Sequence, residues 1–266
     1  MFDQIKRNLY VFGWFLYRDF FIFSKNWHRV AINFGLFIPV SLTFCFGYIL
    51  PNSNMINPSP EQITTFFVGS ILWTLFPLAF VLNIDLLYDL EHDRFIDYQI
   101  SILNPRLILI EKIFFSSLIA FVTSCLFYPV SRLLLGSYFY AAHFSWPALL
   151  MVLYMGSLFC AAFNIFVLSF IESTKKTGIF WMRINNPMIS LGGLFIPWYV
   201  MKIFSPLLGY FILLNPLIYL TEGLRRAIIG DVVFLPIWLC VSMLFLFMIF
   251  FTLLAIYFFK KKIDHI

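Results

Sequence analysis

The stretch that decides the fold runs from Leu235 to Lys262 and reads LPIWLCVSMLFLFMIFFTLLAIYFFKKK. No charged residue occurs between Leu235 and Phe259, and three lysines follow at once. A helix of about 20 apolar residues is enough to cross the hydrocarbon core of a bilayer, so this run is long enough. The lysines place its end on the cytoplasmic side, because basic residues next to a span favour that side. The segment therefore predicts a membrane protein and the orientation of its last span.

The composition of the whole chain agrees with this prediction. Of its 266 residues, 62% are hydrophobic and only 12% are charged, and the mean hydropathy is +0.90. A water-soluble domain cannot hide so much apolar surface, so lipid must cover part of it. The net charge of +5 comes from basic residues beside apolar segments, which membrane topology explains better than nucleic-acid binding. We expect one membrane domain over residues 1–266 and no nucleic-acid partner.

Five further apolar segments precede the last one and predict an all-α protein with six transmembrane helices. The six predicted spans cover residues 30–50, 63–87, 107–135, 147–171, 184–201 and 235–259. The fifth contains two prolines and a pair of glycines, so we expect it to be kinked or irregular. With these spans, 14 of the 18 Lys and Arg residues fall on one side. Both termini are therefore predicted to lie in the cytoplasm.

The chain begins with a segment of mixed character. Between residues 3 and 26, apolar side chains recur at helical spacing and basic side chains stand between them. This pattern is typical of a helix in the headgroup layer, with its apolar side against the lipid. We predict an interfacial helix over residues 1–28. The alternative is an ordinary flanking segment of the first span.

A densely charged segment follows the second predicted span and must lie in water. Its charged and polar residues include Asp89, Glu91, His92, Asp93, Arg94, Asp97 and Tyr98. Apolar residues interrupt them at helical intervals, and the pair Asn104-Pro105 is typical of a helix end. We predict a short amphipathic helix within residues 88–104, on the cytoplasmic side, whose charged face another protein can bind. The alternative is a solvated loop.

Residues 202–234 contain apolar pieces that are too short to cross a bilayer. Prolines and glycines break them, which predicts re-entrant or interfacial helices on the outer side. One of these pieces has its own helix signals. Pro216 stands near the start, Glu222 is spaced to pair with Arg225 or Arg226, and Gly230 marks the end, so a short amphipathic helix is predicted.

Motifs for catalysis or metal binding are missing from the sequence. There is no G-x-x-x-x-G-K-[ST], H-E-x-x-H or G-x-S-x-G, and the four cysteines stand singly in apolar runs. We expect no catalytic residue, no metal and no cofactor in this chain. Polar residues are few within the spans. Arg132 is expected to reach the outer headgroups and Asp85 to be a solvated helix end, with substrate contact and a proton relay as the respective alternatives.

The stretch NPLIYLTEGLRRAIIG, at residues 215–230, resembles the signature of ABC-2 type transporter permeases. In that family the pattern N-P-L-x-Y-x-x-E-x-L-R-x-x-x-x-G precedes the final span, and every specified residue matches here. The resemblance extends to the amphipathic N-terminus, the charged loop ending in Asn104-Pro105, and GGLFIP at residues 192–197. The chain is similar to the small members that export lipid-linked polysaccharides, lipooligosaccharides, teichoic acid precursors or hydrophobic drugs.

The resemblance implies a type V exporter-like fold and a half-transporter in the bacterial cytoplasmic (inner) membrane. Two copies of this permease would each bind a separate ATP-binding subunit, which would hold ATP and Mg²⁺. Residues 88–104 would be the coupling helix and residues 202–234 the outer re-entrant helices. The implied pathway and outer gate contain Phe195, Trp198, Tyr199, Phe204, Tyr210, Asn215, Tyr219, Glu222 and Arg225. Anchoring in lipid is the alternative role for the aromatic residues among them.

Two other classes of function stay open from the residues alone, a secondary transporter and a membrane-embedded enzyme or assembly factor. A secondary carrier predicts inverted repeats and ionisable groups near the bilayer midplane, and the sequence shows no repeat and little charge in its spans. A partner subunit with a Walker motif would distinguish an ATP-driven permease from both.

Overall fold

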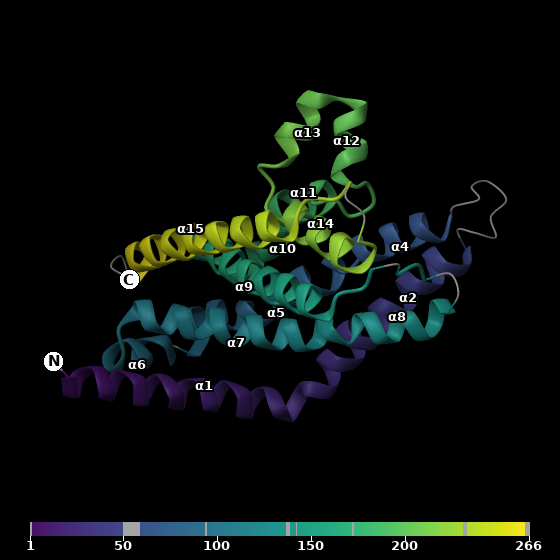
Figure 1. The fold of residues 1–266 in the computed structure, drawn as a ribbon. Helices are drawn as coiled ribbons and strands as arrows, with labels where there is room; N and C mark the ends of the chain where they lie inside the picture. Colours follow the sequence, from purple (N-terminus) through teal and green to yellow (C-terminus); the bar gives the residue numbers. More distant parts are fainter. Residues whose placement is uncertain are drawn as a thin grey trace.

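The computed structural model describes residues 2–49, 59–93, 95–136, 139–141, 143–171, 173–230 and 233–263. Every regular element in these ranges is a helix. Figure 1 shows the long helices side by side, with both ends of the chain at the same end of the bundle. The all-helical class is therefore confirmed. The position of the two ends agrees with an even number of crossings.

A core of four long helices holds the bundle together. They are α5 (Leu72–Tyr88), α7 (Pro105–Cys125), α9 (Trp146–Phe170) and α15 (Ile237–Ile263). The central helix α9 packs against the other three. Its Asn164 side chain donates a hydrogen bond to the Phe76 carbonyl on α5 (3.3 Å) and accepts one from Asn185 (3.1 Å). These bonds satisfy buried polar groups and join segments that are distant in sequence.

By length and composition, four helices of the described residues can cross a membrane. They are Pro60–Glu91, Pro105–Leu135, Trp146–Phe170 and Ile237–Lys262. These four correspond to the predicted spans at 63–87, 107–135, 147–171 and 235–259. The first includes α4 (Pro60–Gly69) before α5, and the second includes α8 (Phe127–Leu135) after α7. A bent helix pair counts as a fifth if it forms one span, and the total of six stays a prediction.

The N-terminal segment shows no break at residue 28, where the sequence predicts the interfacial helix to end before the first span. The chain stays helical from α1 (Phe2–Val30) through η1 (Ala31–Phe37) and α2 (Ile38–Phe44) to η2 (Cys45–Ile49). Figure 1 shows α1 alongside α7, and the chain turns where the π-helical η1 begins. A π-helical turn can redirect a helix without ending it, which the spacing of apolar residues does not reveal. Whether α1 also lies in the headgroup layer stays a prediction.

The predicted fifth span, 184–201, is broken as its glycines and prolines indicated. It contains the end of η6 (Trp181–Asn185), then α11 (Asn186–Leu191), and then the start of α12 (Trp198–Phe204). The residues between α11 and α12 are not helical. Their backbone carbonyls therefore need partners from elsewhere in the protein.

Short helices follow this break and return the chain to the bundle. In Figure 1, α12 and α13 (Pro206–Ile212) form a hairpin that projects away from the long helices. The chain then bends by 100° between α13 and α14 (Leu217–Ile228), and α14 lies within the bundle against α9 and α15. The predicted short helices in residues 202–234 are thus present, while their place on the outer side stays a prediction.

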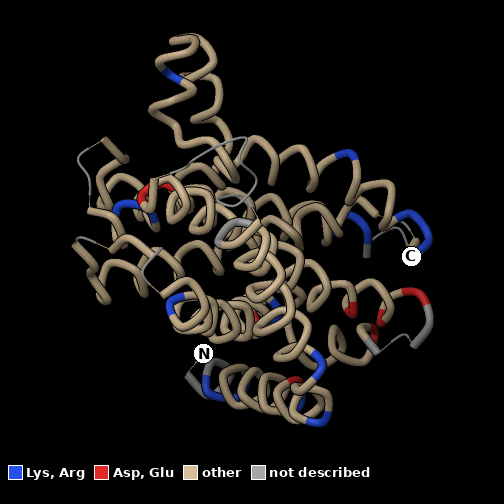
Figure 2. The backbone as a smooth tube through the Cα atoms, turned by 90° about the vertical axis from the view of Figure 1, so that its right-hand side faces the viewer, with Lys and Arg blue, Asp and Glu red and all other residues tan. Residues whose placement is uncertain are grey.

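Several short elements gather at the end of the bundle where the chain begins and ends. They are η3 (Asp89–Asp93), α6 (Phe95–Ile102) and η5 (Thr174–Lys176), and α10 (Thr177–Phe180) continues the chain from η5. Figure 1 shows α6 at this end, and Figure 2 shows acidic residues close to the C-terminal end of α15. The Lys262 ammonium donates to the Ile171 carbonyl (2.5 Å), which ties α15 to the segment before η5.

Candidate functional site

The helix α14 forms where its start and stop signals predicted it. The Asn215 side-chain oxygen accepts a hydrogen bond from the Leu217 amide (3.1 Å), and its amide group donates to the Met188 carbonyl (2.7 Å). Asn215 thus satisfies the first backbone amide of α14 and fastens the helix to α11. Gly230 ends the helix region with φ of 78°, a conformation that suits glycine after a helix C-terminus.

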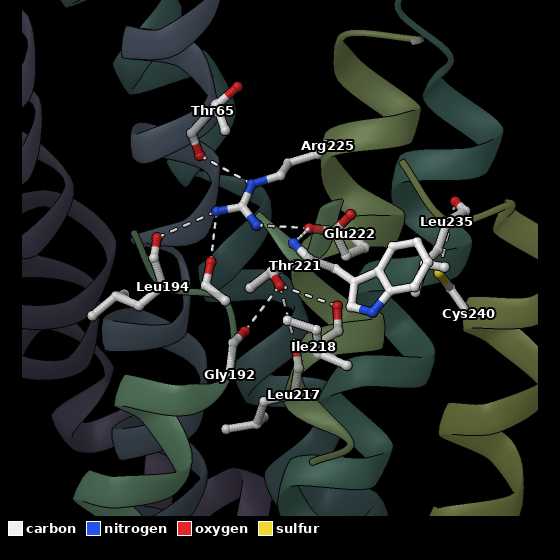
Figure 3. A network of polar contacts seen from close by, with 12 residues as sticks. Thr65, Gly192, Leu194, Leu217, Ile218, Thr221, Glu222, Arg225, Leu235 and Cys240 are labelled. Carbon is white, nitrogen blue, oxygen red and sulfur yellow. Dashed lines mark hydrogen bonds and ion pairs between the residues drawn. The ribbon is translucent and has the colours of Figure 1, made fainter. Parts of the chain in front are cut away.

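Arg225 stands at the centre of a polar network that we call the outer clamp, after the side of the membrane on which the sequence predicts it. It comprises Glu222 and Arg225 of α14, Thr221 beside them, and the backbone groups they bind. The Arg225 guanidinium donates from Nε to the Thr65 carbonyl (3.1 Å), from Nη2 to the Gly193 carbonyl (2.6 Å), and from Nη1 to Glu222 Oε1 (3.0 Å), as Figure 3 shows. Both charged side chains have no exposed surface.

The outer clamp supplies the partners that the break before α12 requires. Glu222 Oε1 also accepts from the Trp198 amide (3.0 Å) at the start of α12, and Thr221 donates to the Gly192 carbonyl (2.9 Å) (Figure 3). Buried backbone groups without partners are costly at membrane depth, and here the side chains of α14 satisfy them. The clamp therefore lets an irregular segment persist inside the bundle.

The helix α14 has the predicted amphipathic distribution of residues, but the structure buries its polar face instead of exposing it. The ion pair between Glu222 and Arg225 has the predicted three-residue spacing, but it is buried and not exposed on a polar face. Every residue of α14 is buried except Arg226, which is half-buried. The reason is that α14 is inserted among α4, α9, α11 and α15, so its charges turn toward the backbone of the break.

Gly69, at the end of α4, lets this helix approach the break closely. A Cβ at Gly69 would collide with the Leu194 carbonyl and with the Arg225 guanidinium. We expect Gly69→Ala to destabilise the protein by about 1–3 kcal/mol, as overpacking does, measured as a lower melting temperature in detergent. Gly13→Ala is the control, because a Cβ there meets no atom within 4 Å. An equal response to both substitutions would show that α4 does not contact the break.

The structure separates the predicted pathway residues into two groups. Phe195, Phe204 and Tyr210 are exposed, and the half-buried Trp198 donates from its indole to the Gly209 carbonyl (2.9 Å), which holds α12 to α13. Tyr199 and Asn215 are half-buried, and Tyr219, Glu222 and Arg225 are buried. The Tyr219 hydroxyl donates to the Leu213 carbonyl (3.0 Å). The buried members therefore hold the backbone, while the exposed aromatic side chains lie on the projecting hairpin or just before it.

At the opposite end, α6 presents two faces, as an amphipathic helix should. Ile96, together with Leu103 just beyond the helix, is buried on one side, and Asp97 and Tyr98 are exposed on the other. The helix ends before Asn104, whose side chain accepts from the Arg106 amide (3.0 Å) and caps α7. The predicted helix is confirmed, although it spans only Phe95–Ile102 of the predicted 88–104.

Glu91 joins two loops that the sequence places far apart. Its carboxylate accepts from the Thr174 amide and from the Thr174 hydroxyl, both at 2.8 Å. The bonds link η3 to η5, which are separated by 83 positions. We call Glu91, α6 and η5 together the inner surface, after the cytoplasmic side on which the sequence predicts them. The Glu91 carboxylate is thus already bonded within the chain. Its predicted contact with a partner would require the partner to bind the same carboxylate or to replace its bonds to Thr174.

The remaining predicted coupling residues are only partly described. Asp89 is half-buried in η3. The side chains of His92 and Asp93 and the whole of Arg94 lie outside the described residues. Asp97 and Tyr98 are therefore the coupling candidates that the structure places on an exposed helical face.

Sequence reasoning missed a charged link between α1 and α7. The Asp19 carboxylate binds the Lys112 ammonium (2.5 Å) and the Arg18 guanidinium (2.6 Å), and both Asp19 and Lys112 are more than nine-tenths buried. Glu111, next to this pair, is buried, and neither of its carboxylate oxygens has a hydrogen-bond partner in the described residues. The sequence did contain a signal for this link. Lys112 falls within a predicted span, and a cation buried there requires a counter-ion.

Arg132 has a local partner at the end of α8. Its guanidinium donates to the Phe139 carbonyl (3.0 Å) and lies over the Phe139 ring. This contact fixes the loop after α8. The sequence analysis considered contact with the outer headgroups or with substrate for Arg132, and it did not predict this role.

The sequence model for ABC-2 family transporter proteins matches residues 50–257. The chain belongs to the ABC-2 family. The match covers the outer clamp and the inner surface, and α1 precedes it. No curated protein and no solved structure matches the chain. Members of this family are membrane subunits of ABC transporters, so this ABC-2 chain is a multi-pass membrane protein, and its family implies an ABC ATPase as partner.

Proposed function

We propose that this ABC-2 protein is the permease subunit of an ATP-driven exporter in the bacterial inner membrane. Its cargo is an amphipathic or lipid-linked molecule, such as a glycolipid, a polysaccharide, a lipid or a hydrophobic drug. Two copies of the chain assemble with two copies of a separate ATP-binding subunit, which holds ATP and Mg²⁺. Both termini of the chain lie in the cytoplasm.

The observation that carries this proposal is the way α6 packs at the inner surface, with one face exposed and the other held by the long helices. Its exposed face, with Asp97 and Tyr98, offers charge and an aromatic ring to a partner. Its buried face is held firmly, because Ile96 packs in a cluster with residues of α5, α7, α9 and α15. Leu103, just beyond α6, packs with Phe15 of α1 and Ile108 of α7. A force on α6 would therefore reach most of the bundle.

The packing of α6 on the long helices explains how ATP binding in the partner could drive a conformational change in this chain. ATP would stabilise the closed pair of ATP-binding subunits, and their movement would displace α6 together with the helices packed on it. A ligand can shift a two-state equilibrium only through different affinities for the two states. Here that difference would arise in the partner and be transmitted as movement of packed helices.

The proposal assigns different roles to the two groups of pathway residues. Phe195, Phe204 and Tyr210 are exposed and would contact the cargo or the outer gate of the pathway. Glu222 and Arg225 are positioning residues, because they hold the break from which that hairpin projects. Trp198, Tyr199, Asn215 and Tyr219 would complete the gate by holding these short helices in place.

The test combines Asp97→Lys with Tyr98→Ala in one variant. Reversing the charge and removing the ring should weaken capture of the ATP-binding subunit about ten-fold, a loss of about 1.4 kcal/mol. The measurement is co-purification of a nucleotide-binding subunit with the tagged chain from native membranes, followed by ATPase activity in nanodiscs. Glu61→Lys is the matched control, because Glu61 is exposed at the start of α4, outside the inner surface.

Wild-type recovery of the ATPase subunit with the double variant would contradict the assignment of α6. Recovery of the intact chain without any nucleotide-binding subunit, together with transport by the chain alone, would contradict the proposed function itself. A lipid and glycan profile of cells that lack this chain would then identify the cargo of a confirmed exporter.

A further inference from the structure

A crevice of about 450 Å³ separates α1 from α5, with α7 at its base. We call it the α1–α5 crevice. Its walls are mixed, since Phe23, Val81 and Phe115 supply apolar surface and five Asp, Lys and Arg residues supply charge. The inner surface and the outer clamp use none of the three apolar residues. The crevice is therefore a separate feature of the chain.

The positive charges of the crevice form one cluster. Arg18 and Lys112 share the carboxylate of Asp19, at 2.6 Å and 2.5 Å. The charges of these three residues sum to +1, and the buried Glu111 beside them does not line the crevice. The ammonium of Lys112 is held in place by its bond to Asp19, so the position that it would offer to an anion is fixed in advance.

Besides Asp19, two further carboxylates of the crevice lie on α5 and η3. Asp85 is exposed in the crevice, and no hydrogen bond or ion pair reaches its carboxylate in the described residues. It lies close enough to Lys112, Asp19 and Asp89 to interact with their charges. Asp89 also lines the crevice, which gives this side two carboxylates.

Asp85 belongs to a helix that can cross the membrane, six residues before the end of Pro60–Glu91. At 1.5 Å per residue this is about 9 Å from that end, near the depth at which headgroups meet acyl chains. A carboxylate at this depth is costly unless water or a cation reaches it. The crevice therefore favours an occupant that brings a cationic group to Asp85.

We propose that the α1–α5 crevice binds a membrane lipid whose headgroup contains both a phosphate and a primary amine, as in phosphatidylethanolamine. The cluster of Arg18 and Lys112 binds the phosphate, and Asp85 with Asp89 binds the ammonium. The apolar walls at Phe23, Val81 and Phe115 contact the acyl chains. The inference concerns binding alone, and it holds whether or not this lipid is the cargo.

The experiment measures lipid retention by the purified full-length chain with native mass spectrometry. Phosphatidylethanolamine competes in detergent with phosphatidylglycerol, which lacks the amine, and with phosphatidylcholine, whose trimethylated amine cannot donate hydrogen bonds. We expect phosphatidylethanolamine to be preferred about five-fold, which is the value of one partly exposed ion pair. Glycerophosphoethanolamine, which has the same headgroup without acyl chains, should not displace it at equal concentration.

The deciding variant is Asp85→Asn, which removes one charge and keeps the shape of the side chain. It should abolish the preference over phosphatidylglycerol, whereas Glu61→Gln, an equal change of charge outside the crevice, should leave the preference intact. Equal retention of the three lipids by the unmodified chain would overturn the proposal. So would an unchanged preference in the Asp85 variant, or displacement of the lipid by the free headgroup.

Discussion

Arg225→Met should lower the stability of this protein by about 3–5 kcal/mol, the usual cost of removing one partner of a buried ion pair. Methionine keeps much of the volume but leaves Glu222 buried without its cation. The Thr65 and Gly193 carbonyls also lose their donor. For a chain of this size the loss corresponds to a fall in melting temperature on the order of 10 °C. Fluorescence-monitored melting in detergent measures it.

Two companion variants separate the role of Arg225 from a general effect of charge. Arg226→Met removes the neighbouring, half-buried arginine and should cost much less. Arg225→Lys keeps the charge but loses the planar fork that reaches several carbonyls, so its cost should be intermediate. If Arg225→Met and Arg226→Met proved equally mild, the outer clamp would not hold the break before α12.

Local signals explain why some elements could be predicted from sequence. The helix α15 follows from an uncharged apolar run, and α14 follows from Pro216 and Gly230 at its ends. The break near residue 192 follows from its glycines and from Pro197, because glycine and proline disfavour the interior of a helix. Each of these inferences depends only on residues within one segment.

Contacts between distant segments could not be predicted in the same way. Arg225 and Thr65 are 160 positions apart, and nothing near either residue identifies the other. The sequence did show that Glu222 and Arg225 could pair, but burial depends on the helices that surround α14. The same holds for Glu91, whose bond to Thr174 depends on how two loops meet at the inner surface.

The second large effect is expected at the link between α1 and α7. Asp19→Leu leaves the Lys112 ammonium buried without its carboxylate, and we expect a loss of about 3 kcal/mol in detergent melting. The double variant with Lys112→Met should recover most of that loss, because no uncompensated charge then remains on that pair. Arg18→Met is the control, since Arg18 binds the same carboxylate but is more exposed and should cost less.

This double-mutant cycle also tests the place of α1, which the family match does not cover. A coupling energy near zero between Asp19 and Lys112 would mean that α1 does not lie along α7 in the membrane. A large coupling would place the α1–α5 crevice in the native protein, because the same ion pair forms its positive end. It would also mean that a force on α6 reaches α1 directly, through the packing of Leu103 on Phe15. The stability of one buried ion pair thus bears both on how lipid could be held and on how ATP-driven movement could spread.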